Sequence, residues 1–520
     1  MTSEHGSERP PSKRPATRTP EFFLAAVLCA AAATRFFRLG HQSLWFDEVF
    51  SLDVVEKPFS ALISEALRDA VHPPLYYILL KPFAMLSESE WILRLPSALL
   101  GIAFVALMYA VVADMLNRRV AGVAAVICLL SPFHVFYSQE TRMYTLLMVM
   151  ALLSTFLLHR ANDREQRAAW TMYSFSIFLL LMTHYVAVGL VVAHGIWAIL
   201  TGKRRKASQQ SGGDLRSSVV TGWIASVAVA GLLSLPWMIG ILQHGQKLGE
   251  RTEDGSLETA IYSLVGTFLS FNFGYFEGLF REGNLVLALV GVASLAALIF
   301  WWQGVSSMLS SRNQRAMDPS ALILLSLIGA TAFSFLVAVF SIFHLPRYYS
   351  AAYPFGVIVM AAGIVAMWER RRPPAVIGGA LLLTLWCIGL RNYYCNPVYA
   401  REDWRSVSRF MQRHKRPDDV LVFNAAYEDI PFRHYFRDTF RKQGLPSVNR
   451  PSEGLVEKEA RPIVVDTDSR RYWLILCYDH ITDPQSLVRK WFDANLRRIE
   501  EHSFSQIDVI LYEDAGSVSR

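Results

Sequence analysis

The chain has 520 residues, of which 52% are hydrophobic and only 18% are charged. A soluble globular chain carries about 25% charged residues, so this composition excludes an ordinary soluble enzyme and indicates a membrane protein. The net charge of +7 does not call for nucleic acid as a partner, because helical membrane proteins gather Lys and Arg in their cytoplasmic loops.

The N-terminal segment, residues 1–20, is rich in Ser, Pro, Arg and Thr. This composition predicts a disordered, basic tail. The apolar stretch that follows resembles a signal peptide. Because many further apolar stretches follow it, we interpret it as an uncleaved first membrane helix.

Apolar stretches recur along residues 21–391, which we predict to form an all-α polytopic membrane bundle. A helix of about 20 apolar residues spans a bilayer. Eleven segments approach or exceed this length: 21–38, 94–116, 120–137, 142–158, 170–184, 186–201, 218–241, 284–302, 320–343, 350–368 and 374–391. The two short segments 170–184 and 186–201 are also compatible with one bent span.

The positions of the basic residues favour eleven spans. With the N-terminus in the cytoplasm, every inner connection carries Lys or Arg, including 117–119, 202–206 and 369–372, as the positive-inside rule requires. A single span over 170–201 would place the Arg-rich connection 369–372 outside. We therefore expect a multi-pass protein of the cell (inner) membrane with an extracytoplasmic C-terminus.

Two long segments before the last span then lie outside. In the first outer loop, residues 39–93, the stretches "PFSALISEAL" and "PPLYYILLKPFAML" are too short to cross and predict interfacial helices. The other segment, residues 242–283, is partly apolar and is compatible with a dip into the outer leaflet.

The segment from residue 392 to the end, 392–520, changes to a soluble composition. "DWRSVSRFMQRH" and "SLVRKWFDANLRRIEE" predict helices, while "DDVLVFN", "RYWLILCYD" and "IDVILYED" predict strands. This alternation predicts a small extracytoplasmic α/β domain. None of the five cysteines forms a CxxC pair, so the sequence has no zinc or redox signature. Cys395 and Cys477 both fall outside, and a disulfide between them is one alternative.

The unusual polar residues all fall on the outer side of the predicted bundle. Acids, histidines and arginines that converge at one membrane face predict a reaction cavity. The set comprises Asp47, Glu48, His72, Lys81, Glu140, Arg142, Tyr144, His184, Tyr185, His344, Arg347 and Tyr348.

Each of these residues also has a structural interpretation. Asp47 is compatible with a helix cap, and Glu48 with an ion pair to a nearby Arg or Lys. Arginines, lysines and tyrosines near a membrane surface often serve as interfacial anchors. His72 is compatible with a loop residue, and Glu140 and His184 with exposed helix ends. The hypothesis of a site therefore depends on the set and not on one member.

Six motifs resemble one family when taken in order: "LWFDE", "HPPLYY", "RLPSALLG", "YSQETRMY", the Arg-Tyr pair at 347–348 and "REDWRSVSRF". Together they resemble the bacterial branch of the dolichyl-phosphate-mannose–protein mannosyltransferase family, glycosyltransferase family 39. This branch is near the aminoarabinose and galacturonic acid transferases that modify lipid A. The resemblance covers roughly residues 20–415.

The resemblance implies the GT-C fold and an active site at the outer face. It also implies transfer of a sugar from a polyprenyl phosphate to an acceptor hydroxyl with inversion. The family's presumed catalytic base corresponds to Asp47, its second acid to Glu48, and its phosphate-binding cations to Arg142 and Arg347. The chain departs from the eukaryotic members beyond about residue 415 and shows no long central soluble insertion, which puts protein O-mannosylation in doubt.

Elementary chemistry agrees with these roles. A carboxylate at hydrogen-bond distance from an acceptor hydroxyl can act as a general base, and the planar fork of Arg can hold two phosphate oxygens. We therefore expect a polyprenyl-phosphate-linked sugar as donor and a lipid, glycan or protein as acceptor. A divalent metal held by Glu48 and a histidine is an alternative, although no ligand spacing is diagnostic and no cofactor is otherwise predicted.

Two other classes of function are compatible with a bundle of this kind. A polytopic transporter or flippase of a lipid-linked sugar would place its polar groups near the bilayer midplane, in repeated halves. Here the charges gather at one face and the halves differ. A catalytically inactive scaffold is disfavoured by the intact Asp47-Glu48 pair.

Overall fold

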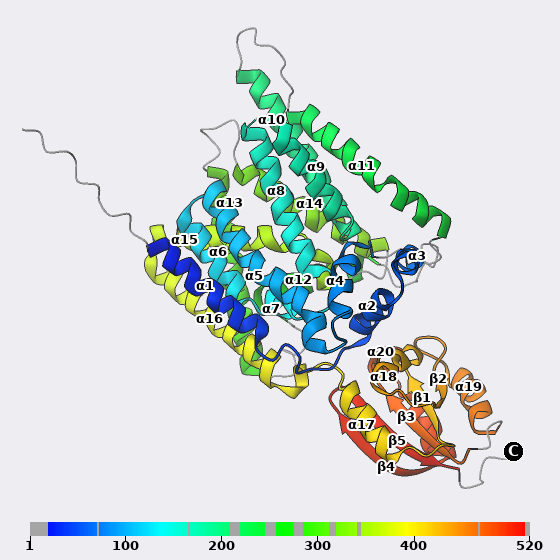
Figure 1. Ribbon diagram of the computed structural model, residues 1–520. Coiled ribbons are helices and arrows are strands. Elements are labelled where there is room, and N and C mark those ends of the chain that lie inside the picture. The colour runs from blue at the N-terminus through cyan, green and yellow to red at the C-terminus, as the bar shows by residue number, and fades with distance from the viewer. Residues whose placement is uncertain are drawn as a thin grey trace, which may run out of the picture.

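The computed structural model describes residues 19–69, 72–164, 167–208, 219–244, 256–274, 284–310, 319–340, 345–465 and 469–514. A large helical bundle is followed by a small α/β domain that lies at one end of the bundle (Figure 1). The predicted fold class is confirmed.

Each of the eleven predicted membrane segments is helical. These helices are α1 (Thr19–Phe36), α5 (Glu90–Met115), α6 (Arg118–Leu130) with α7 (Pro132–Ser138), α8 (Tyr144–Arg164), α9 (Arg167–Leu181), α10 (Val188–Ser208), α11 (Val219–His244), α13 (Asn284–Ser310), α14 (Pro319–Phe340), α15 (Tyr353–Arg370) and α16 (Arg372–Cys395). Within the described residues, seven helices are long and apolar enough to cross a membrane, and the bent pair α6–α7 would be an eighth. The count of eleven spans stays a prediction.

Two breaks between helices have local causes. Between α6 and α7 the axis bends by 61°, because Pro132 begins the second helix without an N–H group to continue the first. The Ser131 hydroxyl caps α7 by accepting a hydrogen bond from the backbone N–H of His134. Likewise, α9 and α10 are two helices separated by a short 3-10 turn, Tyr185–Ala187, which agrees with their prediction as separate segments.

The outer loop folds into three short helices against the end of the bundle: α2 (Phe46–Glu56), α3 (Phe59–Asp69) and α4 (Leu75–Ala84). The last two match the predicted interfacial helices. They enclose a second apolar core that includes Val49, Leu52, Leu62 and Tyr77. The apolar segment predicted to dip into the leaflet contains α12 (Leu257–Phe273), which packs against α7 and α14.

The C-terminal domain is a five-stranded sheet in the order β2-β1-β3-β5-β4. Strand β1 is parallel to β2 and β3, whereas β5 is antiparallel to β3 and β4. Three strands were predicted from the sequence, and β2 and β4 were not. The strands are β1 (Val420–Asn424), β2 (Arg441–Gly444), β3 (Arg471–Leu476), β4 (Arg497–Phe504) and β5 (Ile507–Glu513).

Helices cover both faces of the sheet. Alternate residues of β1 contact α17 (Trp404–His414) and α18 (Asp429–Tyr435) on one face, and α19 (Glu453–Val465) and α21 (Leu487–Asn495) on the other. A short helix, α20 (Asp479–Thr482), follows β3. The prediction of a helix through residue 501 was wrong, because α21 ends at Asn495 and the next residues pair with β5 as strand β4.

The alternative of a disulfide between Cys395 and Cys477 was also wrong. Both Cys395 and Cys477 are free thiols. Cys395 is exposed at the end of α16, whereas Cys477 is buried beneath the sheet in the core that contains Trp404 and Phe432.

Helices α13 and α15 approach each other through glycines. A Cβ atom on Gly363 would lie 1.8 Å from the carbonyl oxygen of Phe300, and one on Gly304 would lie 2.0 Å from that of Val359. Small residues allow such backbone contact between membrane helices. This close pair supports α15, whose first residues follow the Arg347 turn at the domain-bearing end of the bundle.

We expect Gly363→Ala to lower the free energy of unfolding by about 1–3 kcal/mol, because the added methyl group forces α13 and α15 apart. The measurement is thermal unfolding of the purified protein in detergent. The matched control is Gly291→Ala in α13, where a Cβ atom would meet nothing within 4 Å. Equal melting temperatures for the two variants would contradict this account of the packing.

Candidate active site

Side chains from five separate segments meet at the end of the bundle that carries the C-terminal domain. Asp47 lies in the first turn of α2. His72 precedes α4, Arg142 precedes α8, His184 follows α9, and Arg347 lies in the 3-10 turn Pro346–Tyr349 before α15. The predicted convergence of acids, histidines and arginines therefore exists in the fold.

Asp47 is the carboxylate most open to an incoming molecule. Its side chain is 16% exposed, and its Oδ2 lies 2.6 Å from Nη1 of Arg347. Nη1 of Arg142 donates to the backbone carbonyl of Asp47 at 3.3 Å and to the hydroxyl of Ser51 at 3.1 Å. Burial raises the pKa of Asp47, but Arg347 and Arg142 outweigh it and leave the pKa below its usual value. Asp47 is therefore ionised at neutral pH.

Aromatic rings surround the guanidinium of Arg347. Its central carbon lies 5.4 Å from the ring centre of Tyr348, 5.6 Å from that of Trp45 and 6.0 Å from that of Tyr144. Cations at this distance are attracted to the π face. The rings therefore stabilise a charge that is mostly removed from water.

His72 links an acid to Arg142. Its Nδ1 lies 3.0 Å from Oδ2 of Asp69, and its Nε2 lies 3.0 Å from Nη2 of Arg142. Since an arginine can only donate, Nε2 accepts and the proton lies on Nδ1. Burial, followed by the charge of Arg142, lowers the pKa of His72. His72 is therefore a neutral bridge that holds Arg142 in place.

His184 stands behind this bridge. Its ring centre lies 5.9 Å from those of both His72 and Tyr348, and its Nδ1 accepts a hydrogen bond from the backbone N–H of Val186. Burial, followed by the charges of His72 and Arg142, lowers its pKa well below the usual value. His184 therefore contributes a neutral ring to the site wall.

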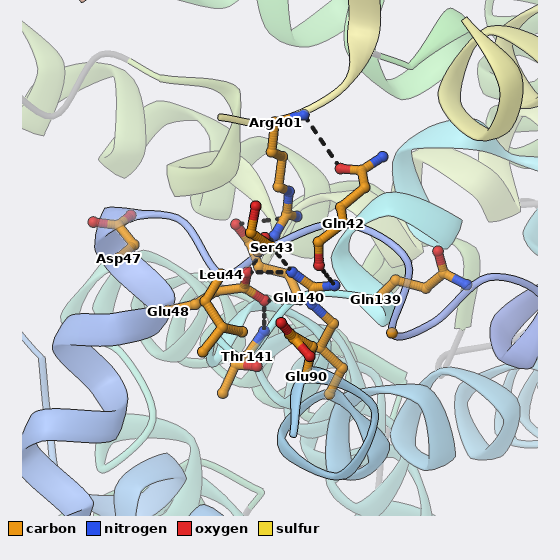
Figure 2. Close-up of polar contacts among 12 residues, drawn as sticks. Gln42, Ser43, Leu44, Asp47, Glu48, Glu90, Gln139, Glu140, Thr141 and Arg401 are labelled. Carbon is orange, nitrogen blue, oxygen red and sulfur yellow. Dashed lines mark hydrogen bonds and ion pairs between the residues drawn. The ribbon is translucent and has the colours of Figure 1, made fainter. Parts of the chain in front are cut away.

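Glu48 points in a different direction from Asp47 (Figure 2). It is fully buried and accepts from Nε and Nη2 of Arg94 at 2.9 and 2.7 Å, and from the backbone N–H of Thr141 at 2.9 Å. Nη1 of Arg401 lies 2.7 Å from Oε2 of Glu48, the oxygen that also accepts from Nη2 of Arg94. Burial raises the pKa of Glu48, but Arg94 and Arg401 lower it to about 2. Glu48 is therefore held by two arginines, Arg94 and Arg401, and its side chain does not reach solvent.

Glu140 is a poorly paired acid near the site. It is 1% exposed, and its Oε1 lies 3.7 Å from Nη2 of Arg401. Its Oε2 has no hydrogen-bond partner among the described residues. Burial is the main cause that raises the pKa of Glu140 to about 7, although Arg401 opposes it.

Two of the predicted site residues, Lys81 and Tyr185, make their hydrogen bonds to other parts of the chain. Lys81 donates to the backbone carbonyls of Val55 and Lys57 and so closes the C-terminal end of α2. The hydroxyl of Tyr185 accepts from the indole N–H of Trp237. The roles of Lys81 and Tyr185 as substrate-binding residues stay predictions, and His344 lies outside the described residues.

The sequence prediction missed Arg94, Arg401 and Trp45 as site residues. Each lies in or beside a motif already noted, since "RLPSALLG" begins with Arg94, "REDWRSVSRF" begins with Arg401, and Trp45 precedes "FDE". What the sequence could not show is that both arginines meet one acid across 46 and 353 positions of the chain.

A cavity of about 250 Å³ opens at the junction of the two domains. Trp45, Phe136, Arg401, Glu402 and Tyr478 are among the residues that line it. Both Arg347 and Arg401 lie over the ring of Trp45, at 5.6 and 5.7 Å. Trp45 therefore lies between this cavity and Arg347, the partner of Asp47.

The described residues offer no group of ligands for the alternative in which a divalent metal is bound. Among the described residues, no three His, Cys, Asp or Glu side chains are grouped as metal ligands. Glu48, the carboxylate named for this role, already accepts hydrogen bonds from Arg94 and from the backbone N–H of Thr141, and it forms an ion pair with Arg401.

We expect Glu48→Gln to destabilise the protein by about 3–5 kcal/mol, because it leaves the buried charges of Arg94 and Arg401 without their counter-ion. Thermal unfolding in detergent measures the loss. Glu56→Gln, the same change at an exposed position of α2, is the control and should unfold like the wild type. A Glu48→Gln protein of undiminished stability would exclude the ion cluster as a structural element.

The raised pKa of Glu140 predicts a pH-dependent stability. Between pH 4.5 and about 7 the folded protein holds a proton that the unfolded chain releases. The contribution of Glu140 to stability should therefore fall as pH rises through this window, by on the order of 3 kcal/mol, whereas the lowered pKa values of His72 and His184 act in the opposite direction. Melting temperatures from pH 4.5 to 8 test this, since the wild type should lose stability with rising pH relative to Glu140→Gln, and the exposed control Glu453→Gln should follow the wild type.

Comparisons with known proteins agree with this architecture. The dolichyl-phosphate-mannose-protein mannosyltransferase family model matches residues 71–230, whereas no curated protein matches the chain. ArnT from Cupriavidus metallidurans, solved bound to undecaprenyl phosphate, superposes with a TM-score of 0.58 at 12% identity, over 95% of this chain and 98% of that one. The oligosaccharyltransferase AglB from Archaeoglobus fulgidus, in complex with an inhibitory peptide and a dolichol-phosphate, gives 0.56 at 10% identity, over 95% and 74%. The resemblance seen in the motifs is confirmed: the chain has the GT-C fold of these membrane glycosyltransferases and carries the mannosyltransferase family's sequence pattern over residues 71–230.

Proposed function

We propose that the chain is an inverting glycosyltransferase that moves a sugar from a polyprenyl phosphate to an acceptor hydroxyl. The observation that carries this proposal is the meeting of one ionised, partly open carboxylate with two guanidinium groups at one end of a membrane bundle. The fold supports it, because the similar ArnT structure holds undecaprenyl phosphate.

Asp47 would act as the general base. A carboxylate within about 2.6–3.2 Å of a hydroxyl can take its proton during attack, which contributes about 10² to 10⁴-fold in rate. The acceptor oxygen would bond to the anomeric carbon from the side opposite the phosphate. The bond from that carbon to the phosphate oxygen would break, and the polyprenyl phosphate would leave with the charge.

Arg347 and Arg142 would receive that charge. Groups that bind the leaving phosphate are most effective when they are already oriented before the reaction. The rings around Arg347 and the His72 bridge to Arg142 provide this orientation. In this proposal His72 and His184 are positioning residues and do not exchange protons.

Glu48 would position the base and would not itself react. It fixes the start of α2 to α5 through Arg94, and to the segment before α17 through Arg401. Asp47 is the neighbouring residue on α2, so this anchoring determines where its carboxylate lies. The sequence prediction gave both acids a catalytic role, and we now propose different roles for them.

The proposal also places the site in the cell. With a cytoplasmic N-terminus, the Asp47 site and the C-terminal domain would face the outer side of the cytoplasmic membrane. Contacts between the domain and the outer loop support a shared location: the hydroxyl of Ser43 donates to the carbonyl of Glu402, and Arg437 pairs with Glu88 at 2.6 Å. An acceptor lipid, glycan or protein would then arrive from the aqueous side.

The test is release of free undecaprenyl phosphate by the purified full chain, given a panel of undecaprenyl-phosphate-linked sugars and an extract of envelope acceptors. Asp47→Asn should lower turnover at least 100-fold while the protein stays folded and retains the donor. Asp53→Asn removes an exposed acid of the same helix and should leave turnover unchanged. Full activity of Asp47→Asn would eliminate Asp47 as the base, and donor movement across the bilayer without release would favour a flippase.

A further inference from the structure

A second large hollow lies on the bundle, away from the Asp47 site. It has a volume of about 1040 Å³ and runs between α1, α6, α15 and α16. Its walls are mainly apolar and include Phe23, Val126, Ile364, Trp368 and Leu383. Phe23, Trp368 and Leu383 are 41%, 48% and 44% exposed, so no part of the described chain covers the groove.

One end of this groove is strongly basic. Arg118, Arg119 and Arg372 line it, with Glu369 as the single acid among the lining residues. Glu369 pairs with Arg119 at 2.9 Å, and Arg372 lies over the ring of Trp368 at 5.8 Å. Within the described part of the chain no carboxylate pairs with Arg118 or Arg372, so two positive charges remain for an external anion.

The basic end lies across the membrane from the catalytic site. The groove's arginines stand where α6 and α16 begin and where α15 ends, whereas the Asp47 site adjoins the opposite end of α15. Helix α15 has 18 residues, which at about 1.5 Å per residue approaches the roughly 30 Å thickness of the hydrocarbon core. The arginines therefore lie at headgroup depth in the leaflet opposite the site, and the apolar walls lie at acyl-chain depth.

We propose that this groove binds an anionic phospholipid of that leaflet. The phosphodiester and its net negative charge meet Arg118, Arg119 and Arg372, and an acyl chain lies along α1, α6 and α16. A zwitterionic lipid brings an ammonium group that these arginines repel. Each basic residue near a membrane surface adds about fivefold to the affinity for an acidic lipid.

Two glycines deepen the groove at acyl-chain depth. A Cβ atom on Gly379 of α16 would meet nothing within 4 Å, and one on Gly122 of α6 would only touch Phe23 at 3.5 Å. A larger side chain at Gly379 therefore projects into the groove without disturbing the fold. A substitution at Gly379 therefore tests whether a ligand occupies the groove without changing the charge of the basic end.

The experiment is native mass spectrometry of the delipidated full chain, titrated with phosphatidylglycerol or phosphatidylcholine of the same chain length. We expect preferential retention of phosphatidylglycerol, a loss of about 25-fold in Arg118→Gln/Arg372→Gln, and a clear loss in Gly379→Leu. Arg167→Gln, an exposed arginine that begins α9, and Gly231→Leu, with open space around its Cβ in α11, are the matched controls.

Three results would overturn the proposal. Equal retention of the two lipids would exclude charge recognition, and undiminished binding by the double arginine variant would place the lipid elsewhere. Displacement of phosphatidylglycerol from the groove by equimolar undecaprenyl phosphate would assign the groove to the polyprenyl carrier instead. Melting temperatures of all variants, measured without lipid, distinguish lost binding from lost folding.

Discussion

The buried cluster of Glu48 with Arg94 and Arg401 is the interaction on which the rest of the site depends. It joins α2, α5 and the segment that leads into the C-terminal domain at one fully buried carboxylate. A buried charge left without its partner is very costly, so none of these three elements can move alone. The outer loop, the bundle and the domain are therefore held in one arrangement around Asp47.

Neighbouring acids on one helix acquire different properties from this arrangement. Glu48 faces inward to arginines that hold it, whereas Asp47 faces the partly open side of α2 and meets Arg347. Sequence adjacency suggested a catalytic pair, but successive residues on a helix point about 100° apart and rarely act on the same atom. The geometry of the helix therefore directs Glu48 toward structural ion pairs and Asp47 toward the proposed reaction.

Much of the fold could be predicted, because hydrophobic length and basic loops are local signals. All eleven apolar segments proved to be helices, and strands β1, β3 and β5 lay where apolar runs indicated. Strand β4 could not be recognised, since "RRIEEHSF" is polar and becomes a strand only by pairing with β5. The sequence indicated that Asp47, Arg142 and Arg347 would converge, as the structure shows. The partners of Glu48, Lys81 and Tyr185, by contrast, depend on distant segments that periodicity does not reveal.

The contact between Asp47 and Arg347 has a consequence for the order of events. The two side chains lie 2.6 Å apart, so the proposed base is paired with a proposed phosphate-binding group. A phosphate that draws the guanidinium toward itself would set the carboxylate free at the same moment. In the proposed mechanism, the arrival of the donor phosphate and the release of the base would thus be one event, because both involve the guanidinium of Arg347.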